Sequence, residues 1–257
     1  MVNRLHNAIR QTLTAISVFL FVPFACFVVP LPAFAQDTPP AKIRLLLIGD
    51  STVASYPNPP ADKPDLTGWG QVFGEYFTDK VEVINHAKSG RSSKSFIREG
   101  LWEKALAAKA DYVFIQFGHN DQKGKPAATE AEGEFRDNLK RYIAEAREHG
   151  MKPILVTPVA RRIFTEGRAS STLGPYADAM KVVGEATKTP VIDLHASSVA
   201  LYDKLGDEGS ADYTAAATDR THFSRKGALA MAKLVAEALR EQVPELKPLI
   251  VGAGPAR

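Results

Sequence analysis

Residues 47–51 read Leu-Ile-Gly-Asp-Ser and end a mostly apolar run that extends from Ile43 to Ile48. An apolar run of this length predicts a buried β-strand, and the Gly-Asp pair predicts the turn that closes it. Ligands bind at the carboxyl ends of strands in open α/β sheets. Ser51 would therefore stand where such a protein places its chemistry.

Four further apolar runs have the length of strands, and amphipathic helical patterns lie between them. The runs cover residues 81–84, 112–117, 153–157 and 191–194. Alternating strands and helices predict an α/β fold with a parallel sheet covered on both faces. Five strands suit a doubly wound, flavodoxin-like sheet, for which the order 2-1-3-4-5 is the default.

The first 35 residues have the features of a secretory signal peptide. Arginines at positions 4 and 10 precede a mostly apolar stretch, residues 13–29, and Ala33-Phe-Ala35 forms a cleavage site. A membrane anchor is the alternative, because the stretch approaches the length that spans a bilayer. The prolines and the Ala-x-Ala site favour cleavage. We therefore expect export, to the periplasm or beyond, with no stable membrane association after cleavage.

Residues 36–257 are long enough for one well-buried core and short for two, so we expect a single domain. The whole chain carries 32 Lys and Arg against 29 Asp and Glu, and this near-balance does not favour a nucleic-acid partner. The only cysteine, Cys26, lies in the leader, so the exported chain would have no disulfide. No set of His, Cys, Asp or Glu has zinc-like spacing. We predict no metal and no cofactor, with a monomer as the default state.

Each of the first four predicted strands is followed by a cluster of polar residues. The clusters cover residues 49–52, 85–93, 118–121 and 157–162. If the strands are parallel, all four clusters meet at one edge of the sheet. Two long polar loops, residues 55–68 and 206–218, add to this set, because loops of such length are more often functional than idle.

These clusters supply the groups that acyl transfer to a serine requires. Ser51 is the predicted nucleophile and His222 the base. Asp219, three residues before His222, can accept the imidazole Nδ1–H and leave Nε2 facing the serine. The backbone N–H groups of Ser51 and Gly90 and the side-chain amide of Asn120 are the predicted oxyanion donors.

Each of these residues alone also has a structural interpretation. An Asp-x-x-His spacing arises by chance, the serine of Gly-Asp-Ser could cap a helix, and Asn120 could be a turn residue. Their order along the chain, each after its own strand, favours a functional site.

Four other residues are weaker candidates for binding substrate. Trp69 is either a core anchor that opens a helix or a platform for a sugar, and the apolar helix that follows favours the core. His86 could line the pocket. Arg161 and Arg162 follow a strand end, where solvated arginines are common, although an acidic substrate could pair with them.

Taken together, these motifs resemble the SGNH (GDSL-type) hydrolase superfamily and, within it, the rhamnogalacturonan acetylesterase-like family. The resemblance implies a three-layer α/β/α sandwich and hydrolysis of acetyl esters on a plant polysaccharide. It gives the five residues of the predicted site the roles already argued from chemistry. The matching segments are Ile48-Gly-Asp-Ser-Thr-Val53, Gly68-Trp-Gly-Gln71, Asn85 with Ala87, Gly90-Arg-Ser-Ser93, Phe117-Gly-His-Asn-Asp121, Thr157-Pro158 with Arg161-Arg162, and Thr221-His-Phe-Ser224.

We therefore expect an exported serine esterase that removes O-acetyl groups from a pectic polysaccharide or its fragments through an acyl-enzyme on Ser51. A lysophospholipase or thioesterase of the same superfamily is one alternative, which the polar loops after the strands disfavour. A non-catalytic carbohydrate-binding protein is another, and it would have a broken catalytic position, whereas none is broken here. Specificity should lie in the leaving group, and hence in the long loops and the arginines.

Overall fold

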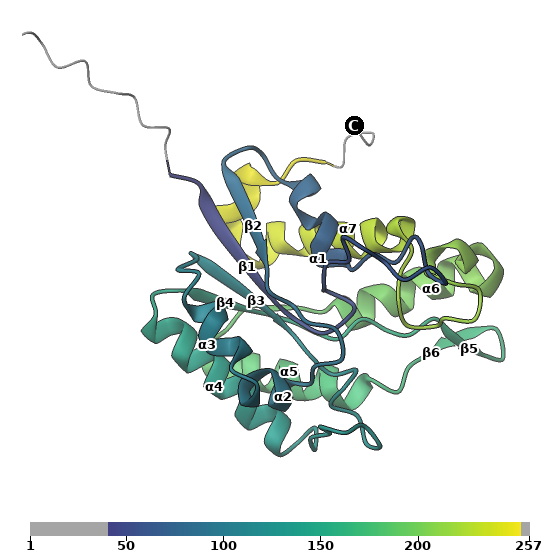
Figure 1. Ribbon diagram of the computed structural model, residues 1–257, viewed down its shortest axis with the longest axis horizontal. Helices are drawn as coiled ribbons and strands as arrows, with labels where there is room; N and C mark the ends of the chain where they lie inside the picture. The colour runs from purple at the N-terminus through teal and green to yellow at the C-terminus, as the bar shows by residue number, and fades with distance from the viewer. Residues whose placement is uncertain (1–40, 253–257) are drawn as a thin grey trace, which may run out of the picture. The chain divides into compact units, whose positions relative to one another are not determined.

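A five-stranded parallel sheet organises residues 41–252, the part of the chain that the computed structural model describes (Figure 1). Its strands lie in the order β2-β1-β3-β4-β7, and every neighbouring pair is parallel. The predicted five strands and flavodoxin-like order are therefore confirmed. The strands are β1 (Ile43–Gly49), β2 (Val81–Asn85), β3 (Tyr112–Gln116), β4 (Lys152–Val156) and β7 (Val191–Ile192).

Helices cover both faces of the sheet, and Figure 1 shows the two groups on opposite sides. One face carries α1 (Trp69–Val72), α6 (Leu194–Gly209) and α7 (Arg225–Gln242). The other carries α2 (Ser93–Arg98), α3 (Leu101–Leu106), α4 (Glu134–Glu148) and α5 (Gly174–Thr187). Three short 3₁₀ helices complete this part of the chain: η1 (Phe73–Tyr76), η2 (Ala211–Tyr213) and η3 (Pro244–Leu249).

The first strand shows why residues 45–48 read as one continuous apolar run. Leu45 and Leu47 belong to the core under α1, α6 and α7, whereas Leu46 and Ile48 belong to the core under α2 to α5. All four side chains are fully buried. Successive side chains of a strand point to opposite faces, so the part of a strand that is covered on both faces has no polar position. The three-layer α/β/α sandwich is confirmed.

Two features differ from a plain alternation of strands and helices. A short antiparallel hairpin, β5 (Ile163–Thr165) with β6 (Arg168–Ser170), follows β4. Both residues of its turn have positive φ, as the tight turns that match strand twist require. The predicted loop 206–218 is partly helical, because α6 continues past a kink at Gly206 and η2 follows.

The predicted signal peptide, residues 1–35, lies outside the described residues. Among the helices of residues 41–252, none combines the length and the apolar character that a membrane crossing demands.

Candidate functional site

Ser51 follows β1 directly, on a turn in which the Asp50 carbonyl accepts the N–H groups of Val53 and Ala54. Its Oγ lies 3.0 Å from His222 Nε2, although 171 residues separate the two along the chain. Ser51 is 7% exposed. The structure thus brings together the hydroxyl and the imidazole that the sequence analysis paired.

The Asp219 carboxylate accepts hydrogen bonds at both oxygens. Oδ1 accepts the backbone N–H groups of Thr221 and His222 at 2.8 and 2.9 Å. Oδ2 lies 2.9 Å from His222 Nδ1 and 2.7 Å from the ammonium of Lys63. Burial raises the pKa of Asp219, but the hydrogen bonds from Lys63, the two backbone groups and the imidazole outweigh it and hold the pKa well below its usual range. The carboxylate is therefore ionised and oriented toward Nδ1.

The segment that carries the imidazole is held by both long loops. Phe223 forms antiparallel bridges with Thr67 of the 55–68 loop and with Thr214 after η2. Ser224 caps α7, since its hydroxyl accepts the N–H of Gly227 and donates to the carbonyl of Asp212. His222 is thus positioned by the start of a long helix and by two flanking segments.

The predicted oxyanion donors come from three different strand ends. Within residues 41–252 the N–H groups of Ser51 and Gly90 donate to no protein acceptor. Gly90 is exposed and has a φ of 79°, a backbone conformation that favours glycine. One N–H of the Asn120 side chain donates to the Arg91 carbonyl at 3.1 Å, and the other has no acceptor within residues 41–252 and could donate to an oxyanion.

The loops that carry these donors are tied to one another and to β1. The N–H of Lys88 donates to the carbonyl of Gly49 at 2.9 Å. The buried carboxylate of Asp121 accepts the backbone N–H and the hydroxyl of Ser93 and the hydroxyl of Thr129. Burial raises the pKa of Asp121 to about 6, against the effect of these hydrogen bonds.

A buried polar network lies next to Ser51. Asp50 accepts the backbone N–H and hydroxyl of Thr52 and contacts His119 Nδ1 at 3.2 Å. Gln116 joins this network to Trp69, because it donates to the Thr52 hydroxyl and accepts the indole N–H at 2.9 Å. Burial raises the pKa of Asp50, but the proximity and hydrogen bond of His119 and the hydrogen bonds of Thr52 outweigh burial and hold the pKa below its usual value.

Two of the predicted substrate-binding residues are corrected by the structure. Trp69 is completely buried in the core, so the alternative of a sugar-stacking platform is wrong. Arg162 is 4% exposed, and its guanidinium binds the carboxylate and carbonyl of Asp207 and the hydroxyl of Ser210. Arg162 therefore fixes the end of α6 and is not available to a substrate.

The other two substrate candidates remain accessible. His86 follows β2 and is exposed. Arg161 is half-buried; Nε donates to Thr221 Oγ1 at 3.2 Å, and Nη1 donates to Gln122 Oε1 at 2.5 Å. It pairs with no carboxylate among residues 41–252. Burial lowers the pKa of Arg161 and nearby Asp50 opposes the shift.

Sequence reasoning missed two residues of the 55–68 loop that reach the site. The Tyr56 hydroxyl donates to the Ser51 carbonyl at 2.8 Å, and Lys63 binds Asp219. The length of the loop was the only signal that could have pointed to them, because no local pattern connects residue 63 with residue 219.

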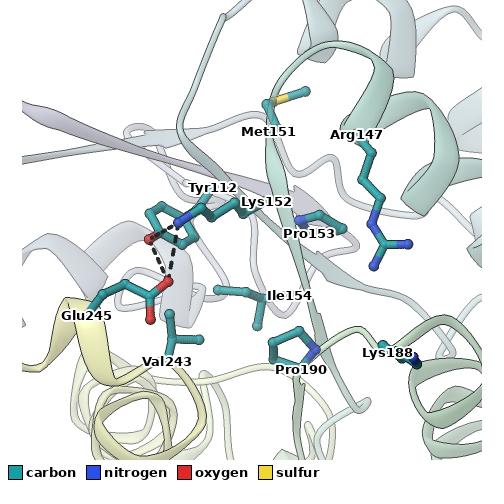
Figure 2. A pocket seen from close by; sticks show the side chains of 10 residues that line it. All are labelled: Tyr112, Arg147, Met151, Lys152, Pro153, Ile154, Lys188, Pro190, Val243 and Glu245. Atoms are coloured by element: carbon teal, nitrogen blue, oxygen red, sulfur yellow. Dashed lines mark hydrogen bonds and ion pairs between the residues drawn. The ribbon is translucent and has the colours of Figure 1, made fainter.

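Two pockets lie away from this site, near the amino ends of the strands. One has a volume of about 250 Å³ and includes Tyr112 and Lys152, the first residues of β3 and β4, together with Glu245 (Figure 2). The other, of about 720 Å³, is lined by residues of α3, of the segment that follows α3 and of the turn before β4. Among residues 41–252, no cluster of His, Cys, Asp or Glu is arranged to hold a metal ion.

Comparison with known proteins finds relatives that are named as acylhydrolases or acetylesterases. The model of the GDSL-like Lipase/Acylhydrolase family matches residues 47–230. Rhamnogalacturonan acetylesterase RhgT of Bacillus subtilis is 44% identical over 225 residues, which cover 81% of this chain and 94% of that protein. The probable rhamnogalacturonan acetylesterase YesY of the same organism is 40% identical over 205 residues, covering 77% and 93%.

Solved structures share the fold. The protein YxiM of Bacillus subtilis superposes with a TM-score of 0.69 at 30% identity, over 80% of this chain and 58% of that one. The acetylxylan esterase Axe2 of Geobacillus stearothermophilus superposes with a TM-score of 0.60 at 20% identity, over 84% and 98%. The second likeness is one of fold alone.

Proposed function

This chain belongs to the GDSL-like lipase/acylhydrolase family, in its rhamnogalacturonan acetylesterase-like group, and is a carboxylic ester hydrolase; from this premise we propose that it removes O-acetyl groups from rhamnogalacturonan or its fragments. The 3.0 Å contact between Ser51 Oγ and His222 Nε2 is the observation that carries the proposal. The features of residues 1–35 support the further proposal that it acts after export.

In the proposed mechanism Ser51 Oγ attacks the acetyl carbonyl while His222 Nε2 takes the serine proton. The negative charge that develops on the carbonyl oxygen is stabilised by the N–H groups of Ser51 and Gly90 and the amide of Asn120. His222 then gives its proton to the departing sugar hydroxyl, and an acetyl-enzyme remains. Asp219 keeps the proton on Nδ1 and stabilises the imidazolium.

Deacylation repeats these steps with water as the nucleophile. His222 takes a proton from water, the hydroxide attacks the acetyl-enzyme, and the same donors stabilise the second tetrahedral intermediate. Acetate leaves, and the serine recovers its proton from the imidazolium. Because acetyl is small, selectivity must come from the sugar side, where the accessible guanidinium of Arg161 favours a polymer with carboxylates.

The test is acetate release from acetylated rhamnogalacturonan, acetylated xylan and 4-nitrophenyl esters of increasing acyl length. We expect release from the pectic polymer to be the fastest, and Ser51→Ala to reduce every activity by a factor on the order of 10³ or more. Acetate release by the Ser51→Ala variant at the wild-type rate would refute the proposed nucleophile. A preference for octanoyl over acetyl esters would refute the proposed substrate class.

A further inference from the structure

Lys63 reaches the catalytic carboxylate from a distant part of the chain. Its Nζ lies 2.7 Å from Asp219 Oδ2, the same oxygen that contacts His222 Nδ1. The Asp219 side chain is only 7% exposed and that of Lys63 28% exposed, so the ion pair is more shielded than a typical surface pair. The contact joins residues 156 positions apart.

The 55–68 loop holds Lys63 in place through its own hydrogen bonds. The N–H of Lys63 donates to the Pro60 carbonyl, and the Lys63 carbonyl accepts the N–H of Leu66. Thr67, next along the loop, donates its N–H to the Phe223 carbonyl at 2.9 Å. The ammonium and the segment that carries His222 are therefore fixed to each other by two separate contacts.

We propose that Lys63 is a positioning residue of the triad: it occupies the outer side of Asp219 Oδ2 and, by its charge, limits how strongly that carboxylate favours a proton on His222. The inference rests on the proposed esterase mechanism. A resting imidazolium cannot accept the serine proton, so an ammonium that offsets part of the carboxylate charge extends activity toward lower pH. The four hydrogen bonds to Asp219 also leave its carboxylate only one orientation.

The other charged groups near the Lys63–Asp219 pair are the same in wild type and in the Lys63 variants that we propose to compare. Asp62 acts on Lys63 from the same loop. The charges of Asp50 and Asp219 both contribute to the raised pKa of the Tyr56 phenol. From the β4 side, the Arg161 guanidinium binds Thr221, and the Asp50–His119 pair lies next to Ser51. None of them contacts Asp219 Oδ2 as Lys63 does.

The experiment measures kcat/KM against pH for 4-nitrophenyl acetate with wild type, Lys63→Met and Lys63→Arg. Met keeps the length of the stem and removes the charge, whereas Arg keeps the charge. We expect Lys63→Met to move the midpoint of the acidic limb upward by about half a pH unit, as one removed unit charge near the site would do. Lys63→Arg should keep the wild-type midpoint.

Lys80→Met is the matched control, because Lys80 is an exposed lysine at the amino end of β2, and its midpoint should equal that of wild type. A loss of activity with an unmoved midpoint in Lys63→Met, or an equal shift in Lys63→Arg, would overturn the charge role of Lys63. Failure of the proposed serine-esterase mechanism would be distinguishable from failure of the role of Lys63, because hydrolysis of 4-nitrophenyl acetate would then persist in Ser51→Ala.

Discussion

Arg161 and Arg162 are neighbours in the sequence but serve different purposes in the fold. Arg162 is buried and ion-paired with Asp207, so its charge is neutralised within the protein. Among residues 41–252, Arg161 bonds only to neutral groups, which are the hydroxyl of Thr221, the amide oxygen of Gln122 and the carbonyl of His119. A partly buried guanidinium is stabilised by an anion, and a uronate of the proposed pectic substrate would supply one.

Replacement of Arg161 by Gln should therefore weaken binding of acidic substrate and spare the chemistry. We expect KM for acetylated rhamnogalacturonan to rise about tenfold, the loss of one charge-assisted hydrogen bond. The kcat/KM for neutral 4-nitrophenyl acetate should stay within about twofold, as should KM for a polymer whose carboxyl groups have been reduced. Arg168→Gln, on the exposed hairpin, is the control. An equal loss on the carboxyl-reduced polymer would contradict this role.

Asp121 connects the loops after β2 and β3. Its raised pKa predicts that the stability of the protein depends on pH. Burial raises its pKa from 3.8 to about 6. The protonated form is thus favoured by folding: its contribution is complete below the unfolded value and is lost as pH rises through about 6. Compared with Asp121→Asn, the wild type should lose on the order of 2 kcal/mol of unfolding free energy between about pH 4 and about pH 7.

Urea unfolding of both proteins at several pH values measures this difference. Asp219, whose pKa is lowered, contributes equally to both curves and cancels in the comparison. The charge of Asp50 acts on Asp121, but the lowered pKa of Asp50 keeps that carboxylate mostly ionised over this pH range in both proteins. Parallel stability curves for wild type and Asp121→Asn would show that the Asp121 carboxyl does not titrate in this range.

At the scale of elements, the start of α7 positions the base. The Ser224 hydroxyl caps the helix and also donates to the Asp212 carbonyl, which ties η2 to the same point. Gly227 makes this approach possible, because a Cβ there would lie 2.1 Å from the Tyr213 carbonyl oxygen. The geometry of His222 thus depends on contacts two to five residues beyond it.

Ser224→Ala should lower the unfolding free energy by about 1–2 kcal/mol through the lost cap. It should also lower kcat, with a smaller change in KM. Ser224→Thr, which retains an oxygen at the cap, should restore most of both. Thermal or urea unfolding and ester hydrolysis measure the two effects. If the alanine variant unfolded earlier but kept its full kcat, the helix start would not be what positions His222.

The elements of the sheet could be predicted because local patterns determine them. Strands buried on both faces read as apolar runs, and β1, β2 and β3 begin at the residues expected from the sequence. The hairpin β5–β6 gave no such signal, since its strands are three residues long and partly exposed. Lys63 and the pairing of Arg162 with Asp207 depend on contacts between segments far apart in sequence, which no local pattern encodes.

At the scale of the whole molecule, the described sheet begins after the predicted signal peptide. The first strand begins at Ile43, eight residues after the predicted cleavage site, so removal of residues 1–35 leaves the sheet intact. We expect mature protein isolated from the producing cell to begin at Gln36, by intact mass or N-terminal sequencing. A chain expressed from Gln36 should have the specific activity of that mature protein. Recovery of the full-length chain from membranes would instead support the anchor alternative.

The distance of 171 residues between Ser51 and His222 has a consequence for biosynthesis. A ribosome-bound, incomplete polypeptide contains the serine long before it contains the histidine, and such an intermediate is inert. Deacetylation can start only once the last quarter of the polypeptide has emerged and docked. In a refolding time course, the onset of ester cleavage would therefore mark the moment at which the segment that carries His222 packs against the sheet.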